Sequence, residues 1–229
     1  MMTEDEWLRC TDPEPMLDHL YTSEPSRKMQ LIAAACLRRI EHLLTDEGCR
    51  GAILAIECEA MDDADFRKAY DAAYGGWDRM ASAAYDGNYS TALLRAMSSA
   101  GLAAWHAIDG DMQCVGEVAD SVAAFAAPDK TPQWFAARQA ESTTQSSIIR
   151  EIMGNPFRSI AFSPTWRTSE VVAIARRAYE NREFSSMPRL GSALAAVGCN
   201  NSHILEHCQQ TSKHVRGCWV IDLVLDMKP

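Results

Sequence analysis

Cysteine and histidine side chains gather near the C-terminus at spacings that suit a metal ion. His203 and His207 are four residues apart, and the same spacing separates His214 from Cys218. Residues four apart share one face of a helix, so each pair can present two side chains together. Zinc takes four nitrogen and sulfur ligands in a tetrahedron, and two such pairs on adjacent helices can close one site. The candidate zinc ligands are Cys199, His203, His207, Cys208, His214 and Cys218.

The spacing of these residues leaves the kind of zinc site open. No Cys-x-x-Cys pair occurs in the chain, so the cluster matches no standard zinc finger. The run from His203 to His207 reads His-x-x-Glu-His, the pattern of inverted zinc peptidases, but those enzymes need a third ligand, and only Asp222 and Asp226 follow as acids. A zinc protein, structural or hydrolytic, is therefore the alternative interpretation. The simpler one places the cysteines in the core and the histidines on polar faces.

Sequence patterns of common catalytic sites are absent. The chain contains no Gly-x-Ser-x-Gly, no Gly-x-x-x-x-Gly-Lys-Ser/Thr and no Gly-x-Gly-x-x-Gly. A hydrolase nucleophile elbow, a nucleotide-binding P-loop and a dinucleotide fold therefore have no support. We expect a non-enzymatic protein without a cofactor, with zinc as the alternative.

Aromatic and basic residues in an irregular segment indicate where another protein would bind. Residues 155–166 carry two prolines and no helical repeat, and aromatic side chains are favoured both in cores and at interfaces. We expect a protein-interaction or scaffolding module whose binding surface comprises Asn155, Phe157, Arg158, Trp166, His214, Arg216 and Trp219.

Helical periodicity runs through most of the chain and predicts an all-α fold of about nine or ten helices. Apolar residues recur three or four apart, as in Ile32, Cys36 and Ile40. Pro13 and Pro15 break the opening, so the first predicted helix follows Ser23 or Ser26. Further along, Gly75-Gly76 predicts a helix end, Thr131-Pro132 predicts a helix start, and Gly154 ends that helix after an internal break. Residues 215–225 are rich in β-branched side chains, but a lone strand has no partner, so we favour a helix there.

The irregular segment divides the chain into two parts of different charge. Residues 1–150 are predicted to form an acidic, alanine-rich helical part, and residues 151–229 a compact C-terminal helical unit, packed together as one globule. The second part carries 9 Lys and Arg against 7 Asp and Glu, a net of +2, so the remaining 13 and 24 give the first part a net of −11. The acidity therefore belongs to the N-terminal part.

Composition and charge exclude several classes of protein. The formal net charge of −9 has the wrong sign for a protein that binds nucleic acid through its overall field. The N-terminus is acidic where a signal peptide is basic, and no apolar run approaches the ~20 residues of a membrane span. We expect a cytoplasmic protein that does not enter a membrane and whose eight cysteines are thiols.

Short segments near both ends carry a family resemblance. The opening reads Met2-Thr3-Glu4-Asp5-Glu6-Trp7-Leu8, then Cys10-Thr11-Asp12-Pro13, Pro15-Met16-Leu17, Arg27-Lys28 and Cys36-Leu37-Arg38-Arg39-Ile40. Later segments are Gly154-Asn155-Pro156-Phe157-Arg158, Gly198-Cys199 and His214-Val215-Arg216-Gly217-Cys218-Trp219. Over residues 2–45 and 150–225 the chain resembles a family of uncharacterised proteins common in planctomycete-type bacteria. That family has no assigned activity, so the resemblance implies a bacterial cytosolic protein and directs attention to residues 155–158 and 214–219.

Overall fold

The computed structural model describes residues 2–20, 26–58, 63–85, 91–109, 112–128, 130–210 and 214–227. Within these ranges the chain is all-helical, with twelve α-helices and no strand, so the predicted class is confirmed and the predicted number of helices was too low. The chain divides into two compact units, Met1–Ile149 and Arg150–Pro229, next to the division predicted after residue 150. No helix in the described ranges has the length and apolar character that crossing a membrane requires.

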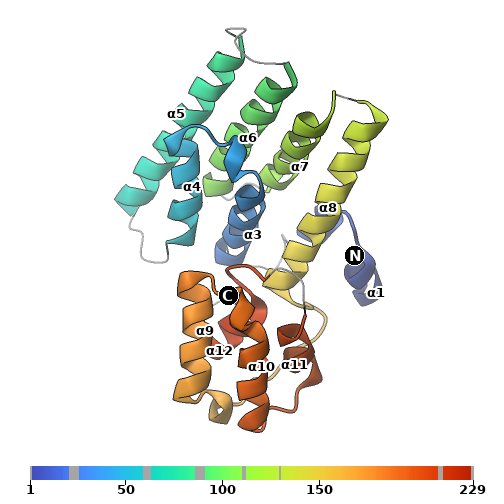
Figure 1. Cartoon of the computed structure of the whole chain (residues 1–229), viewed down its shortest axis with the longest axis vertical. Coiled ribbons are helices and arrows are strands. Elements are labelled where there is room, and N and C mark those ends of the chain that lie inside the picture. The colour runs from blue at the N-terminus through green and yellow to red at the C-terminus, as the bar shows by residue number, and fades with distance from the viewer. Residues whose placement is uncertain are drawn as a thin grey trace. The chain divides into compact units, whose positions relative to one another are not determined.

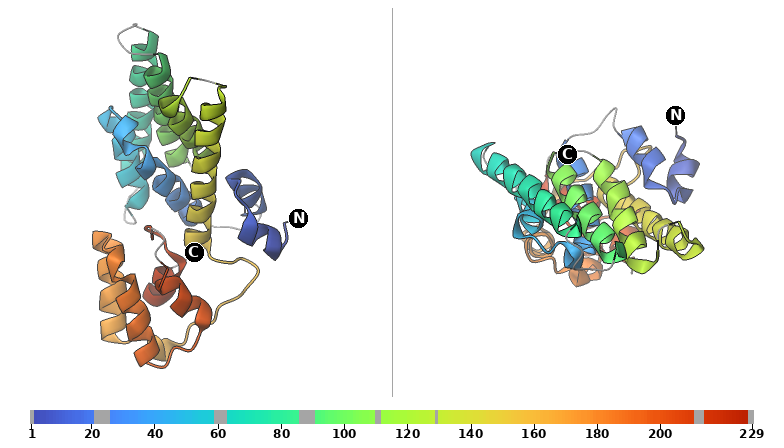
Figure 2. Two further views of the ribbon diagram at one scale, coloured as in Figure 1. Left: turned by 45° about the vertical axis from the view of Figure 1, so that its right-hand side comes forward. Right: turned by 90° about the horizontal axis from the view of Figure 1, so that it is seen from above.

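In its described ranges, the first unit contains eight helices that follow one another along the chain (Figure 1). They are α1 (Glu4–Arg9), α2 (Pro13–Leu20), α3 (Ser26–Arg39), α4 (Glu47–Glu57), α5 (Asp63–Tyr85), α6 (Thr91–Asp109), α7 (Gln113–Ala126) and α8 (Pro132–Met153), with a 3-10 turn at Glu41–Leu43. Helix α6 packs against both α5 and α7, as the views in Figure 2 show. Its buried face is mostly alanine, which lets these helices approach closely.

The opening of the chain is helical, contrary to the expectation that its prolines break it. The hydroxyl of Thr3 accepts a hydrogen bond from the Glu6 amide, and the Glu6 carboxylate accepts one from the Thr3 amide at 2.7 Å. This reciprocal capping box starts α1. Pro13 is the first residue of α2, where a missing N–H costs nothing because that group has no partner in a helix. The opening of the chain therefore forms two helices, α1 and α2, because their start signals outweigh the effect of the prolines.

Glycines in α4 and α5 allow two backbones to approach, and they do not end a helix. The predicted helix end at Gly75 and Gly76 is wrong, because α5 continues through both. A Cβ atom on Gly76 would lie 2.5 Å from Oδ1 of Asp46. On the facing helix, a Cβ atom on Gly48 would lie 2.1 Å from the carbonyl oxygen of Ala72. At these two positions, only the hydrogen atom of glycine fits, and a methyl group would collide with its neighbours.

Helix α8 is continuous, without the predicted break, and contacts other helices through polar side chains. The Glu141 carboxylate, which is buried, accepts hydrogen bonds from Arg39 at 2.6 and 2.7 Å. The Gln145 side-chain amide donates to the carbonyl oxygen of Val115 at 2.9 Å. The hydrogen bonds between Arg39 and Glu141 are charge-assisted, so they are strong and offset the cost of burying the carboxylate. The last residues of α8 belong to the second unit.

The second unit contains four helices around an apolar core. They are α9 (Ser169–Asn181), α10 (Met187–Ala196), α11 (Ser202–Cys208) and α12 (Trp219–Leu225), with 3-10 turns at Pro164–Trp166 and Phe184–Ser186. Helix α9 contacts α10 and α12, and α10 also contacts α11. The helix favoured for residues 215–225 is confirmed, in the shorter form of α12. The core includes the side chains of Cys199, Cys208 and Cys218.

Replacement of Gly48 by alanine tests the close approach of α4 and α5. We expect Gly48→Ala to lower the free energy of unfolding by about 1–3 kcal/mol, because the added methyl group meets backbone that has to move. Gly51→Ala on the same helix is the control: nothing lies within 4 Å of its Cβ position. It should raise stability by about 0.5–1 kcal/mol through the higher helix propensity of alanine. Urea denaturation followed by circular dichroism measures both, and equal effects would contradict the packing argument.

Candidate metal centre

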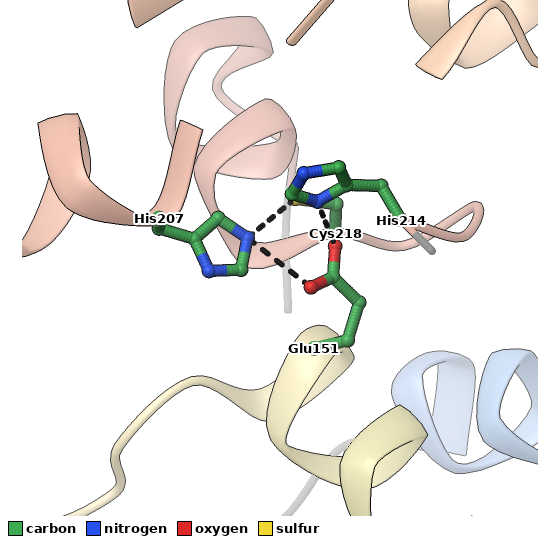
Figure 3. Close-up of side chains that lie close together, drawn as sticks. All are labelled: Glu151, His207, His214 and Cys218. Atoms are coloured by element: carbon green, nitrogen blue, oxygen red, sulfur yellow. Dashed lines mark hydrogen bonds and ion pairs between the residues drawn. The ribbon is translucent and has the colours of Figure 1, made fainter. Parts of the chain in front are cut away.

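Four buried side chains of the second unit converge at one point, namely Glu151, His207, His214 and Cys218. Each offers one ligand atom, and these atoms all lie within 4.8 Å of one another. Glu151 and His207 are 6% exposed, His214 is 7% exposed and Cys218 is 0% exposed. Figure 3 shows the Glu151 carboxylate reaching from the end of α8 toward the two imidazole rings. The arrangement combines nitrogen, oxygen and sulfur donors in a space closed to solvent.

Helix ends and a tight turn position these side chains. Glu151 lies in the last turn of α8, and His207 lies in the last turn of α11. Asn201 caps the start of α11, and its side-chain oxygen accepts hydrogen bonds from two amides of the first turn. Cys218 is the residue that precedes α12, and its amide donates to the carbonyl oxygen of Val215 at 3.1 Å. The sequence therefore brings three separate segments to one place through local stop and start signals.

Hydrogen bonds connect the four side chains and extend to Trp219. His214 Nδ1 lies 2.8 Å from Oε1 of Glu151, and His207 Nε2 lies 3.3 Å from Oε2 of the same carboxylate. His207 Nε2 also lies 3.2 Å from Sγ of Cys218. On the other side of that ring, the Trp219 indole N–H donates to His207 Nδ1 at 3.2 Å. His214 Nε2 is buried and has no hydrogen-bond partner among the described residues.

Burial and the neighbouring rings set the charge state of Glu151 and Cys218. Burial would raise the pKa of Glu151, but hydrogen bonds from His207 and His214, with the attraction of their rings, outweigh it and lower the pKa to about 2. Burial, reinforced by the Glu151 carboxylate, raises the pKa of the Cys218 thiol well above its ordinary value. Before a cation enters, the cluster therefore holds a carboxylate beside a neutral thiol.

Two distances within the cluster are close to the edges of a zinc tetrahedron. Zinc–nitrogen, zinc–oxygen and zinc–sulfur bonds of ordinary length place neighbouring ligand atoms about 3.3 to 3.6 Å apart. His207 Nε2 lies 3.3 Å from the Glu151 carboxylate and 3.2 Å from the Cys218 sulfur, close to that range. Two histidines, one cysteine and one carboxylate form a four-ligand set that zinc accepts. The distance from His214 Nδ1 to the Glu151 carboxylate, 2.8 Å, is shorter than such an edge, so these two side chains would have to move apart to bind one ion.

The contact between Cys218 and His207 also resembles the start of a nucleophilic site, in which histidine takes the proton of a thiol. A catalytic thiol needs a lowered pKa and access to a substrate. The Cys218 side chain is 0% exposed and its pKa is raised. Its surroundings therefore do not suit a catalytic nucleophile.

Of the six predicted zinc ligands, His207, His214 and Cys218 meet in the cluster. Cys199 and Cys208 lie in the apolar core, where burial raises the pKa of Cys208 to about 12. Among the described residues the cluster does not include them.

His203 lies apart from the cluster, although it is four residues from His207. It is exposed in the first turn of α11, and its Nε2 lies 3.0 Å from NH1 of Arg158. Glu206 is exposed as well. The His-x-x-Glu-His pattern therefore supplies one ligand of the described cluster and neither the second histidine nor the glutamate.

Glu151 is the ligand that sequence reasoning missed. It lies 56 positions before His207, on a different helix, so no local spacing connects the two residues. A weak signal was present: Glu151 follows Ile148 by three positions and precedes Ile152 directly, so an acid shares the buried side of an apolar helix end. A charge in that position needs a partner.

The residues of the predicted interaction surface differ in exposure. Phe157 and Arg158 are exposed, and Asn155, Trp166, Arg216 and Trp219 are partly exposed. His214 is buried, and both tryptophans pack against the core of the second unit. His214 belongs to the cluster, and Trp219 donates a hydrogen bond to its member His207. The Arg216 guanidinium lies 4.4 Å from the centre of the Tyr179 ring.

Comparison of the whole chain with models of protein families, with curated proteins and with solved structures finds no match. The resemblance to planctomycete-type proteins therefore stays a prediction.

Replacement of Glu151 by glutamine tests the hydrogen bonds of the metal-free cluster. We expect Glu151→Gln to lower the free energy of opening of α12 by about 1–3 kcal/mol, because the new NH2 group faces an imidazole donor and leaves it unpaired. Native-state hydrogen exchange of the α12 amides in chelator-treated protein measures this free energy. Glu206→Gln, an exposed acid on α11, is the control and should change it by less than about 0.5 kcal/mol. Equal values for the two variants would show that the buried carboxylate is not held by the rings.

Proposed function

We propose that this protein binds one zinc ion through Glu151, His207, His214 and Cys218, and that the metal stabilises its C-terminal unit. The observation that carries the proposal is the convergence of four ligand atoms of three types, one carboxylate, two imidazoles and one thiol, within 4.8 Å, all from buried side chains. Three separate segments of the unit contribute these ligands. A cation that ties such segments together contributes its binding free energy to folding.

Charge in the cluster supports a cation as its occupant. The Glu151 carboxylate is buried, and the imidazoles of His207 and His214 are its partners while no cation is bound. Coordination would add a second negative ligand, because a thiol bound to zinc loses its proton. A divalent cation compensates both charges. The mixed nitrogen, oxygen and sulfur set favours zinc over magnesium or calcium, which prefer oxygen ligands alone.

Closure of the site favours a structural role for the metal over a hydrolytic one. Catalytic zinc sites keep one position open for water or substrate, whereas structural sites fill all four positions with protein ligands. Here four side chains supply four ligands, and none is more than 7% exposed. We therefore propose that zinc has a structural role and stabilises the fold of the C-terminal unit.

Protein binding stays a prediction for the exposed part of the expected surface. Phe157 is 38% exposed, and Arg158 beside it is exposed as well. Both follow α8 within seven residues of Glu151. A structural zinc ion would fix the helix end from which this segment departs.

Elemental analysis of tag-free protein tests zinc binding directly. We expect about one zinc ion per chain in the wild type, from the four-ligand set. Removal of one ligand in His207→Ala or in Cys218→Ala should reduce the content to near zero.

Two residues of the same types provide matched controls for these variants. His203 lies on the same helix as His207, and Cys199 lies in the same core as Cys218, but neither belongs to the cluster. His203→Ala and Cys199→Ala should therefore keep their zinc. Wild-type protein that takes up no zinc when refolded with the ion would refute the proposal.

Metal removal tests the structural role. Stripping the ion with a chelator should lower thermal stability, and adding zinc at a hundredfold excess over its Kd should restore about 2.7 kcal/mol. Differential scanning calorimetry measures the change. The Cys218→Ala variant should show no response to zinc, and a response equal to that of the wild type would assign the effect to a different site.

A further inference from the structure

Trp219 contacts the proposed zinc ligand His207 in a way that opposes coordination. We propose that the indole N–H of Trp219 holds His207 in the tautomer that cannot bind a metal, so that Trp219 lowers the affinity of the site and zinc displaces its hydrogen bond. Trp219 is thus a positioning residue that tunes the site. This inference rests on the proposed function.

The hydrogen bond from Trp219 determines which nitrogen of His207 carries the proton. An indole N–H only donates, and it points at His207 Nδ1 from 3.2 Å. A nitrogen that accepts a hydrogen bond has a free lone pair, so in the neutral ring the proton sits on Nε2. Nε2 is also the nitrogen that faces the Cys218 sulfur and the Glu151 carboxylate. The atom that the metal needs is therefore protonated.

Metal binding reverses this distribution. Coordination by Nε2 requires its lone pair, so the proton leaves Nε2 and the neutral ring carries its one proton on Nδ1. Nδ1–H then faces the indole N–H of Trp219, and two donors oppose each other. Histidines that bind metals ordinarily donate their second N–H to a carboxylate, a carbonyl or water. His207 meets a donor at that position, so the indole has to turn away when the ion enters.

Packing keeps the indole of Trp219 in place. Its ring centre lies 5.0 Å from that of His207. On another side it contacts Gly154, where an added Cβ atom would lie 3.2 Å from Cγ of Trp219. Gly154 has φ of +70°, a conformation that glycine adopts readily, and it follows Glu151 by three residues. The indole is therefore seated against the same helix end that carries the acidic ligand.

Competition titration of zinc against a chromophoric chelator tests the inference on the full chain. Trp219→Phe removes the donor and keeps an aromatic ring, so we expect its Kd for zinc to be roughly threefold to tenfold lower than that of the wild type, the equivalent of one net hydrogen bond. Trp166→Phe is the matched control in the same unit: its ring contacts Phe162, and it should leave the Kd unchanged. General damage to the unit would raise the Kd, so the expected direction separates tuning from damage.

Imidazole ¹⁵N chemical shifts provide a second readout that needs no variant. In zinc-free wild-type protein at pH 8, His207 should carry its proton on Nε2, and zinc should move it to Nδ1. A proton on Nδ1 before zinc is added would overturn the inference, whatever the folding of Trp219→Phe.

The titration separates failure of the inference from failure of the proposed function. Wild-type protein that binds zinc while Trp219→Phe binds it equally or more weakly would refute the role of Trp219 and leave the zinc site intact. Wild-type protein that binds no zinc would refute both.

Discussion

One buried carboxylate determines the chemistry of the C-terminal unit. Glu151 accepts a hydrogen bond from each of two imidazoles, and those rings come from parts of the chain more than fifty residues away. Its negative charge cannot be left alone in an apolar surrounding, so the rings must face it, and Cys218 lies beside them. An interaction of this kind is strong only when every member is present. The four side chains therefore form a single unit, and the apolar core around them has to provide space for it.

Helix periodicity predicted the class of the fold and most of its boundaries. The start at Thr131-Pro132, the stop at Gly154 and the final helix follow from local signals, and the structure has them. Errors arose where local signals compete with each other or with tertiary contacts. Pro13 reads as a breaker, but it is the first residue of α2, where its missing N–H would have no partner in the helix. The Gly75-Gly76 pair reads as a stop, although α5 continues through it and Gly76 leaves room for the side chains of Asp46 and Cys49.

The candidate site was predicted only in part, for a physical reason. His207, His214 and Cys218 were selected by residue type, and type limits which atoms can bind zinc. Whether these side chains meet in space depends on the packing of the helices, and the residue types alone do not indicate that packing. Cys199 and Cys208 have the same chemistry as Cys218, yet they lie within the apolar core and outside the described cluster. The acidic partner was missed because its connection to the histidines is made entirely by tertiary structure. Hydrogen-bond direction at Trp219 is a further property that only coordinates reveal.

The position of Glu151 near the end of α8 limits where this chain can be divided into fragments. The most conspicuous break in the sequence follows Gly154, where the helical pattern stops and the prolines begin. Glu151 lies just before that break, in the last turn of a helix that starts at Pro132. A fragment cut at the visible boundary would keep both histidines and the cysteine and lose the acid that faces them. A C-terminal fragment that contains the whole cluster therefore has to begin inside α8. A domain boundary placed at the irregular segment would separate Glu151 from the other three side chains.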